Sequence, residues 1–323
     1  MYSALGANTI KTALDKVIFQ EFTPDQLVGL ATAETSALFN QIPIKKSAQI
    51  EEIFGGSGYW ETRGELENVP AGQSKVTNQQ VFTVVNFAKS EDISKNYFDD
   101  EQWNVVTNIV RMMALNGKQT RNRKAFEIWR GAFANTLTAD GSALCADSHN
   151  LLNSSGTVDN YLTAKLNEDT LNDAIVALGQ QKAQDGVVMG LNPNCLLVPL
   201  ARYKLAAELL DSSLKSQTAN NDLNVYSSKY GIMLYQSPFL GSAISASSGN
   251  NETLTAGSDH YWFLLAKFHQ VNRYKRQDLV TDLVDYKYSR NNVYTYKAEF
   301  REVYGAPDYM GVVGSDGSTG AYA

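Results

Sequence analysis

The sequence lacks the patterns that indicate a membrane, secreted or metal-binding protein. No apolar run in its 323 residues approaches the roughly 20 residues of a membrane helix. Residues 1–6 contain no basic stretch that leads into a long apolar one, so no secretory signal is visible. The two cysteines, Cys145 and Cys195, lie far apart and form neither a CxxC motif nor a zinc spacing. We therefore expect no membrane span, no metal site and two reduced, buried thiols.

Catalytic motifs are missing as well. The sequences GxSxG, HExxH, Walker A and GxGxxG do not occur. Asp147-Ser148-His149 brings a carboxylate near one of the three histidines, and a carboxylate can orient an imidazole. One Asp-x-His without further ligands makes no metal site, so a polar turn is the favoured interpretation and a hydrolase that uses His149 the less favoured one. The sequence predicts no enzyme, no catalytic residue, no cofactor and no metal.

Charge and composition favour an ordinary folded protein. Lys and Arg number 28 and Asp and Glu number 34, which gives a formal net charge of −6. This balance argues against a protein that wraps nucleic acid by charge alone, although it permits a local basic patch. Hydrophobic residues make up 43% of the chain and charged residues 19%, so its bulk is neither disordered nor a coiled coil.

The first hundred residues predict an arm followed by a long hairpin. Residues 1–46 are expected to be helical or irregular and weakly anchored, with a short helix that begins at Pro24. Residues 47–98 predict a β-hairpin, because the arms 48–54 and 81–88 are rich in β-branched and aromatic residues. The connection between the arms far exceeds the usual 2–5 residues. Such an arm can hardly bury itself in its own subunit, and a flexible loop is the alternative.

Residues 99–136 predict one long helix. Asp99 or Asp100 is expected to cap it, and apolar residues then follow at 3–4–3–4 spacing. A helix of about 36 residues would span about 54 Å, which suits a spine across a flat domain. The apolar stripe consists of Trp103, Val106, Val110, Met113 and Gly117.

The second half of the chain predicts an α/β segment and then a β-rich one. Asn167 is expected to cap a helix, and a turn at Asn291-Asn292 is expected to join two strands. Further strands are expected at 195–199, 231–235 and 261–265, a helix at 200–210, a surface excursion at 242–258, a hairpin at 279–290 and 293–303, and a frayed tail at 314–323.

This order of parts resembles the tailed-phage major capsid proteins of the Hong Kong 97-type fold, which encapsulin shells share. Three stretches carry the local resemblance. Asp140-Gly141-Ser142-Ala143-Leu144 followed by Ser148-His149 resembles a "DG-x-x-L-F-…-H-P" stretch of Mu-like head subunits, from which Cys145 and Asn150 depart. Asn194-Cys195-Leu196-Leu197-Val198-Pro199 resembles a "P-x-x-L-L-V-P" step, and Tyr261-Trp262-Phe263-Leu264-Leu265 a late "W-F-L" strand.

The resemblance implies an α+β fold with named parts. Residues 1–46 would be the N-terminal arm and residues 47–98 the extended hairpin, or E-loop. Residues 99–165 and 260–323 would form the P-domain, with its spine helix at 99–136, and residues 166–259 the A-domain. We also expect no cleaved N-terminal scaffolding region, because only about 46 residues precede the hairpin and they lack dense charge or heptads.

The function implied is that of a major capsid (head) protein located in the virion. Copies would assemble in the host cytoplasm through pentamers and hexamers into an icosahedral shell around double-stranded DNA, which the inner face would contact without sequence specificity. Portal and scaffold proteins are expected partners, and a decoration or cement protein is another. The alternative is an encapsulin-like nanocompartment that holds cargo enzymes.

Opposite charges on the hairpin tip and the spine helix predict contacts between copies. The hairpin of the family's prototype also joins a Lys to a neighbour's Asn with help from a Glu. Lys75 is a candidate here, but no feature marks an acceptor, so we expect no covalent cross-link. The residues expected at inter-subunit contacts are Tyr59, Trp60, Glu61, Arg63, Glu65 and Glu67 of the tip and Lys118, Arg121, Arg123 and Lys124 of the helix.

Overall fold

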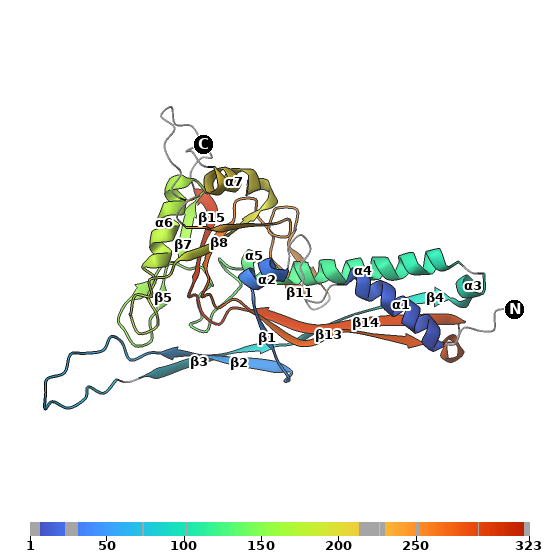
Figure 1. Cartoon of the computed structure of the whole chain (residues 1–323), viewed down its shortest axis with the longest axis horizontal. Helices are drawn as coiled ribbons and strands as arrows, with labels where there is room; N and C mark the ends of the chain where they lie inside the picture. Colours follow the sequence, from blue (N-terminus) through green and yellow to red (C-terminus); the bar gives the residue numbers. More distant parts are fainter. Residues whose placement is uncertain are drawn as a thin grey trace.

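Two sheets organise the chain in its computed structural model (Figure 1). One has four strands in the order β1-β13-β14-β4, and the other has five in the order β7-β15-β12-β8-β9. Helices and strands are mixed throughout, so the predicted α+β class is confirmed. The structure describes residues 7–22, 32–72, 74–100, 102–212, 226, 230–249, 252–289 and 291–319. The helix expected after Pro24 lies outside these residues.

The four-stranded sheet is built on a long hairpin near the C-terminus. Strands β13 (Asn272–Val284) and β14 (Val293–Gly305) pair antiparallel and extend the hairpin expected at 279–303. Asn292, in the predicted turn, has a φ of 53°, a left-handed conformation that asparagine tolerates better than most residues. Strand β4 (Val85–Ser94) adds antiparallel to β14, and β1 (Asn40–Pro43) adds parallel to β13.

The spine helix is shorter than the sequence predicted. Helix α4 (Trp103–Ala125) has 23 residues, and its apolar stripe faces the long sheet through Val106, Val110 and Met113. The prediction of 99–136 is wrong at both ends. A separate helix α3 (Lys95–Asp99), capped by Ser94, precedes it, so neither predicted aspartate caps the spine.

Beyond the spine, the chain makes a short helix and a tight turn. Helix α5 (Glu127–Arg130) leads into a turn at Gly131, where a Cβ atom would lie 2.7 Å from Oγ1 of Thr136. Glycine has no Cβ atom, so it permits this close turn, and the helix ends at Arg130.

The N-terminal arm is anchored, contrary to the prediction that it is weakly held. Helix α1 (Ala7–Glu21) lies across α4 and the sheet (Figure 1). Its Ile10, Leu14 and Ile18 are buried, since the 4–4 spacing places them on one face. Asp15 also accepts hydrogen bonds from the hydroxyls of Thr281 and Tyr296 in the sheet.

The five-stranded sheet has β12 (Trp262–Ala266) at its centre, with every residue buried. Helix α6 (Glu168–Gly179) packs on this sheet and begins at the predicted cap Asn167, which forms a capping box with Thr170. The other strands of this sheet are β7 (Tyr161–Ala164), β8 (Pro193–Pro199), β9 (Met233–Ser237) and β15 (Val312–Thr319). Helix α7 (Tyr203–Asp211) also packs on the sheet. Shorter elements include α2 (Thr32–Leu38), β5 (His149–Asn150), β6 (Thr157–Val158), η1 (Leu200–Arg202), β10 (Ser247–Gly249), β11 (Glu252–Leu254) and η2 (Tyr286–Tyr288).

Two expectations about the C-terminal region change in this sheet. Of the tail predicted to fray at 314–323, residues 314–319 belong to β15, which lies between β7 and β12 and whose first four residues are buried. Residues 260–323, expected in one domain with the spine, contribute strands to both sheets. The division into domains therefore stays a proposal. None of the helices that the structure describes is long and apolar enough to cross a membrane.

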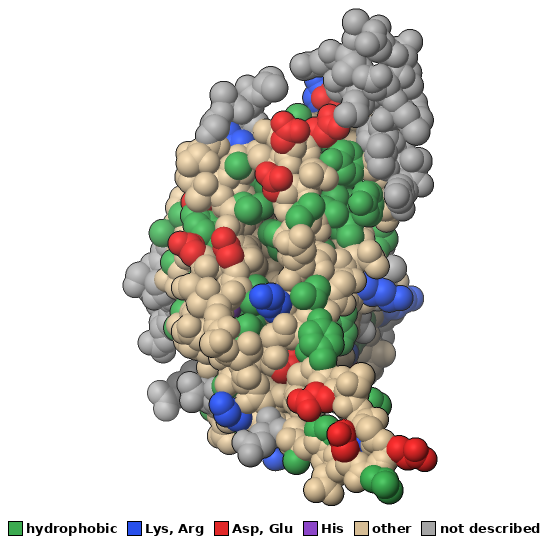
Figure 2. Space-filling model, turned by 90° about the vertical axis from the view of Figure 1, so that its left-hand side faces the viewer, with side chains coloured by type: hydrophobic (Ala, Val, Ile, Leu, Met, Phe, Trp, Pro, Cys, Tyr) green, Lys and Arg blue, Asp and Glu red, His purple; other side chains and the backbone are tan. Residues whose placement is uncertain are grey.

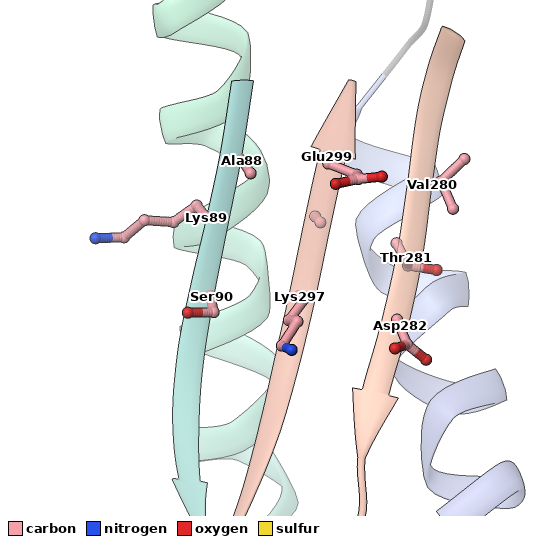
Figure 3. A pocket seen from close by; sticks show the side chains of 9 residues that line it. Ala88, Lys89, Ser90, Val280, Thr281, Asp282, Lys297 and Glu299 are labelled. Atoms are coloured by element: carbon pink, nitrogen blue, oxygen red, sulfur yellow. The ribbon is translucent and has the colours of Figure 1, made fainter. Parts of the chain in front are cut away.

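The long sheet also has a polar face. Figure 3 shows a shallow depression there, with helices behind the three strands β4, β14 and β13. The depression has a volume of about 330 Å³. Its lining includes Val280, Asp282, Lys297 and Glu299, so it carries charges of both signs. The opposite face, against α1 and α4, carries the apolar residues.

A buried ionic network joins the spine helix to this sheet. Arg121 Nε lies 3.4 Å from one carboxylate oxygen of Glu302, and Arg273 Nη2 lies 2.7 Å from the other. All three side chains are only 2% exposed, and Tyr304 donates a further hydrogen bond to Glu302. Arg121, expected at a contact between copies, thus turns inward in the single chain and stacks over Phe22.

We predict that Glu302→Ala strongly destabilises the unassembled subunit, because it leaves two buried guanidinium groups without their shared carboxylate. The expected loss is about 3–5 kcal/mol in the free energy of unfolding, measured by urea denaturation. Glu299→Ala is the matched control, since Glu299 lies on the same strand but is only half-buried. Equal, small losses in both variants would contradict the role given to the network.

Candidate assembly surface

The predicted hairpin exists as a two-stranded ribbon. Strands β2 (Ala48–Gly55) and β3 (Lys75–Thr83) pair antiparallel, with Ala48 opposite Thr83 and Gly55 opposite Lys75. The returning arm predicted at 81–88 divides, because its later residues leave the ribbon and enter β4 of the long sheet. The ribbon therefore emerges directly from the body of the molecule and carries its loop outward (Figure 1).

The loop at the far end of the ribbon exposes its apolar side chains. All residues described between 59 and 72 are exposed, including Trp60 (97%), Leu66 (100%) and Val69 (72%). Acidic and hydrophobic side chains occur together at the bottom of the view in Figure 2, the end from which the loop projects. Large apolar groups this exposed on an extended loop indicate a surface that another molecule covers.

A small turn shapes this loop. Arg63 Nε donates to the backbone oxygen of Glu67, and the Glu67 carboxylate accepts from the backbone N–H of Gly64. Both charged side chains, predicted as contacts with a neighbour, are thus engaged within their own loop. Glu61 and Glu65 are exposed beside it.

The base of the loop is tethered to its own chain. Asp185 accepts from the backbone N–H of Gly58 at 3.3 Å, and Asn153 Nδ2 donates to the backbone oxygen of Gly56 at 2.6 Å. The Tyr59 hydroxyl accepts from the backbone N–H of Val188, although its ring is 68% exposed. Sequence reasoning missed this clamp, because Asn153 and Asp185 look like ordinary turn residues. Lys75 Nζ donates nearby to the backbone oxygen of Leu152.

The basic group of the spine helix is smaller than predicted. Arg121 is buried, whereas Lys118, Arg123 and Lys124 are half-buried near the C-terminal end of α4. The ribbon separates these residues from the acidic loop of the same chain (Figure 1). Any pairing of the two groups would therefore join different copies.

His149 occupies a closed structural site. Its ring is fully buried, with Nδ1 2.8 Å from Asp140 Oδ2 and Nε2 3.2 Å from Asn160 Oδ1. Tyr309 stacks on the ring at a centroid distance of 4.2 Å. The geometry offers no exposed imidazole face to a substrate, which disfavours a hydrolase that uses His149. Among the described residues, no group of three or more potential ligands could hold a metal ion.

Two carboxyls near His149 titrate in opposite directions. Burial alone would raise the pKa of Asp140, but hydrogen bonds from His149, Thr138 and Ser142 together lower it. Burial raises the pKa of Asp308 to about 6, with hydrogen bonds from Tyr309 and Gln184 only partly opposing it. Asp140 is thus held charged, whereas Asp308 is an unfavourable buried charge at neutral pH.

We predict that Asp308→Asn stabilises the subunit at pH 7.5 and not at pH 4.5. Because the folded pKa lies above the unfolded one, Asp308 lowers stability as pH rises from about 4 to about 6. Asparagine keeps the acceptor and removes the charge, so the gain is on the order of 1–3 kcal/mol. Urea midpoints at both pH values measure it, with Asp173→Asn on the exposed face of α6 as control. A gain independent of pH would argue against this account.

Comparison with known proteins places this fold among phage capsids. The sequence matches the family described as "Phage capsid protein" over residues 77–315. The fold is similar to the bacteriophage PhiM1 mature capsid, with a TM-score of 0.58 and 11% identity over 86% of this chain and 85% of that one. It is also similar to the cyanophage P-SCSP1u capsid, with a TM-score of 0.51 and 12% identity over 87% and 86%. No curated protein matches the sequence significantly.

The family match covers more than half of the chain, and the similar structures confirm the predicted Hong Kong 97-type fold. The predicted function as a major capsid protein is confirmed in the same way, and the encapsulin-like alternative is not favoured. A closer relation to Mu-like head subunits stays a prediction. The extended ribbon, the spine helix and the two sheets are thus the parts of a shell subunit, and the chain belongs to the phage capsid protein family.

Proposed function

We propose that this capsid protein joins its copies chiefly through the exposed loop of the β2–β3 ribbon. The loop of one copy lies on the body of the next, and repetition of this contact in pentamers and hexamers closes an icosahedral shell around double-stranded phage DNA. The single observation that carries the proposal is the loop at 59–72, which is exposed throughout and yet displays Trp60, Leu66 and Val69.

The physics of the ribbon supports this assignment. An isolated two-stranded ribbon is marginally stable in water, so a partner is needed to order its end. The clamp at Gly56 and Gly58 holds only the base of the loop. Burying an indole as large as that of Trp60 supplies the kind of anchor that dominates protein interfaces.

Charge then sets the register of the contact. Glu61 and Glu65 on the loop face Lys118, Arg123 and Lys124 near the end of the neighbour's spine helix. Exposed ion pairs of this kind contribute about 0–1 kcal/mol each, so they orient the copies more than they hold them. Arg121, which the buried network occupies, takes no part.

Other partners follow from the shell. A portal and a scaffold protein would define its entrance and its size, a decoration or cement protein could cover its outer face, and DNA would touch the inner face without sequence specificity. Assembly would take place in the host cytoplasm. Electron microscopy of expressed particles, with a test for nucleic acid inside, checks these expectations; particles filled with enzyme cargo would contradict them.

We predict that Trp60→Ala blocks or strongly weakens shell assembly but leaves a folded, soluble subunit. The side chain is 97% exposed in the single chain, so its loss removes an interface anchor and no core contact. Particle yield by sedimentation and thermal unfolding of the free subunit measure the two effects. Tyr288→Ala is the matched control, because Tyr288 is an aromatic residue that is 86% exposed and does not belong to the loop. An unfolded Trp60→Ala subunit, or normal particles from it, would refute the proposal.

We further predict that reversing Glu61 and Glu65 to Lys impairs assembly more at low salt than at high salt. Like charges would then meet near the neighbour's spine helix, and salt screens exposed charges over about 10 Å at 0.1 M. Light scattering during assembly across a salt series measures the effect. A defect that stays constant with salt would show that charge does not set the register.

A further inference from the structure

A preformed apolar groove lies at the root of the ribbon, where β3 passes into the long sheet. We call it the root groove, and its volume is about 310 Å³. Its walls come from β3, the start of β4, the end of the spine with α5, the turn after α5 and the end of β14. The apolar lining includes Phe82, Val85, Ile128, Leu137 and Tyr304.

Local contacts hold the root groove open. Phe82 stacks on Tyr274 at 5.2 Å, and a Cβ atom at Gly305 would lie 2.1 Å from the Phe82 ring, so only glycine leaves room there. Gln80 Nε2 donates to the backbone oxygen of Leu137 at 2.6 Å and joins two walls. The groove is therefore a fixed feature of the subunit.

Apolar surface in the root groove remains in contact with solvent in the single chain. Val85 is 42% exposed and Leu137 is 47% exposed. Lys124 and Glu127 lie at the same groove, and Lys124 is one of the three basic residues at the end of the spine. Arg130 and the backbone N–H of Thr255 engage the Glu127 carboxylate. The groove thus combines an apolar floor with the Lys124 cation, which complements a loop that has Glu61 directly after Trp60.

The chain's own Trp60 is held away from this groove. Gln80, in the groove wall, pairs with Glu51, and the ribbon continues outward for four more residues to Gly55. At about 3.3 Å per residue, these four residues place the outer end of the ribbon, at Gly55, about 13 Å from the groove wall at Gln80. The clamp by Asp185 and Asn153 then fixes the loop base at that outer end. Only another copy can bring a Trp60 to the root groove.

We propose that the root groove receives the Trp60 indole of a neighbouring copy, with Glu61 of that copy beside Lys124. This inference rests on the proposed function, in which the loop lies on an adjacent subunit, and it names the place where the loop is bound. An indole is flat and apolar, and a groove of about 310 Å³ has room for one.

A disulfide between copies tests the placement directly. The chain carries Glu61→Cys and Lys124→Cys together and keeps Trp60, while Cys145 and Cys195 are buried and do not compete. A disulfide requires Cα atoms within about 7 Å, so mild oxidation of particles should give a ladder of covalent multimers that reductant removes. Each single variant, and the pair of Glu61→Cys with Val176→Cys on α6, should give no ladder.

A second variant keeps Trp60 intact. Leu137→Glu should raise the subunit concentration needed for assembly about tenfold or more, because it places a carboxylate in the apolar groove and opposite Glu61. Val176→Glu is the control, since Val176 is 46% exposed elsewhere. Normal assembly of Leu137→Glu, or assembled double-cysteine particles without a ladder, would overturn the groove as the binding place. The loop's own role would stand in either case as long as Trp60→Ala blocks assembly.

Discussion

The carboxylate of Glu302 fixes the geometry on which the rest of this subunit depends. It holds Arg121 of the spine helix and Arg273 of the neighbouring strand at once, inside a region that excludes water. With two buried guanidinium groups around one carboxylate, the spine helix has little freedom to slide over the sheet, because any shift would leave a buried charge without its partner. The same stretch of β14 forms a wall of the root groove. The network thus sets the helix, the sheet and the groove in one arrangement.

The subunit divides its apolar surface between two purposes. Within the body, α1 and α4 bury one face of the long sheet, and α6 and α7 pack on the second sheet. The ribbon instead exposes apolar side chains. Its loop is held at the base, and Trp60 and Leu66 remain in contact with solvent. A body with buried apolar clusters and a loop with exposed apolar side chains are suited to a protein whose final structure forms only with its copies.

The sequence predicted the regular elements better than the places where they meet. The helix after Asn167 and the turn at Asn292 follow local rules of capping and backbone conformation, and both are present. The spine helix ends at Ala125, and the short helix α5 and the turn at Gly131 follow, a break that the 3–4–3–4 spacing does not report. Arg121 looked like a surface residue because its partner Glu302 lies 181 positions later in the chain. The clamp by Asp185 was hidden for the same reason.

The arrangement of loop and groove also bears on the symmetry of the shell. The proposed contact joins two different patches of one chain, the loop at the outer end of the ribbon and the groove at its root. Such a heterologous contact leaves a pair of copies with one free loop on one copy and one free groove on the other, so copies add head to tail until the rotation closes a ring. A two-fold contact would instead satisfy both patches in a dimer. Rings of five or six then require only a small change in the angle between copies, which a ribbon anchored at its base can supply without altering the buried network behind it.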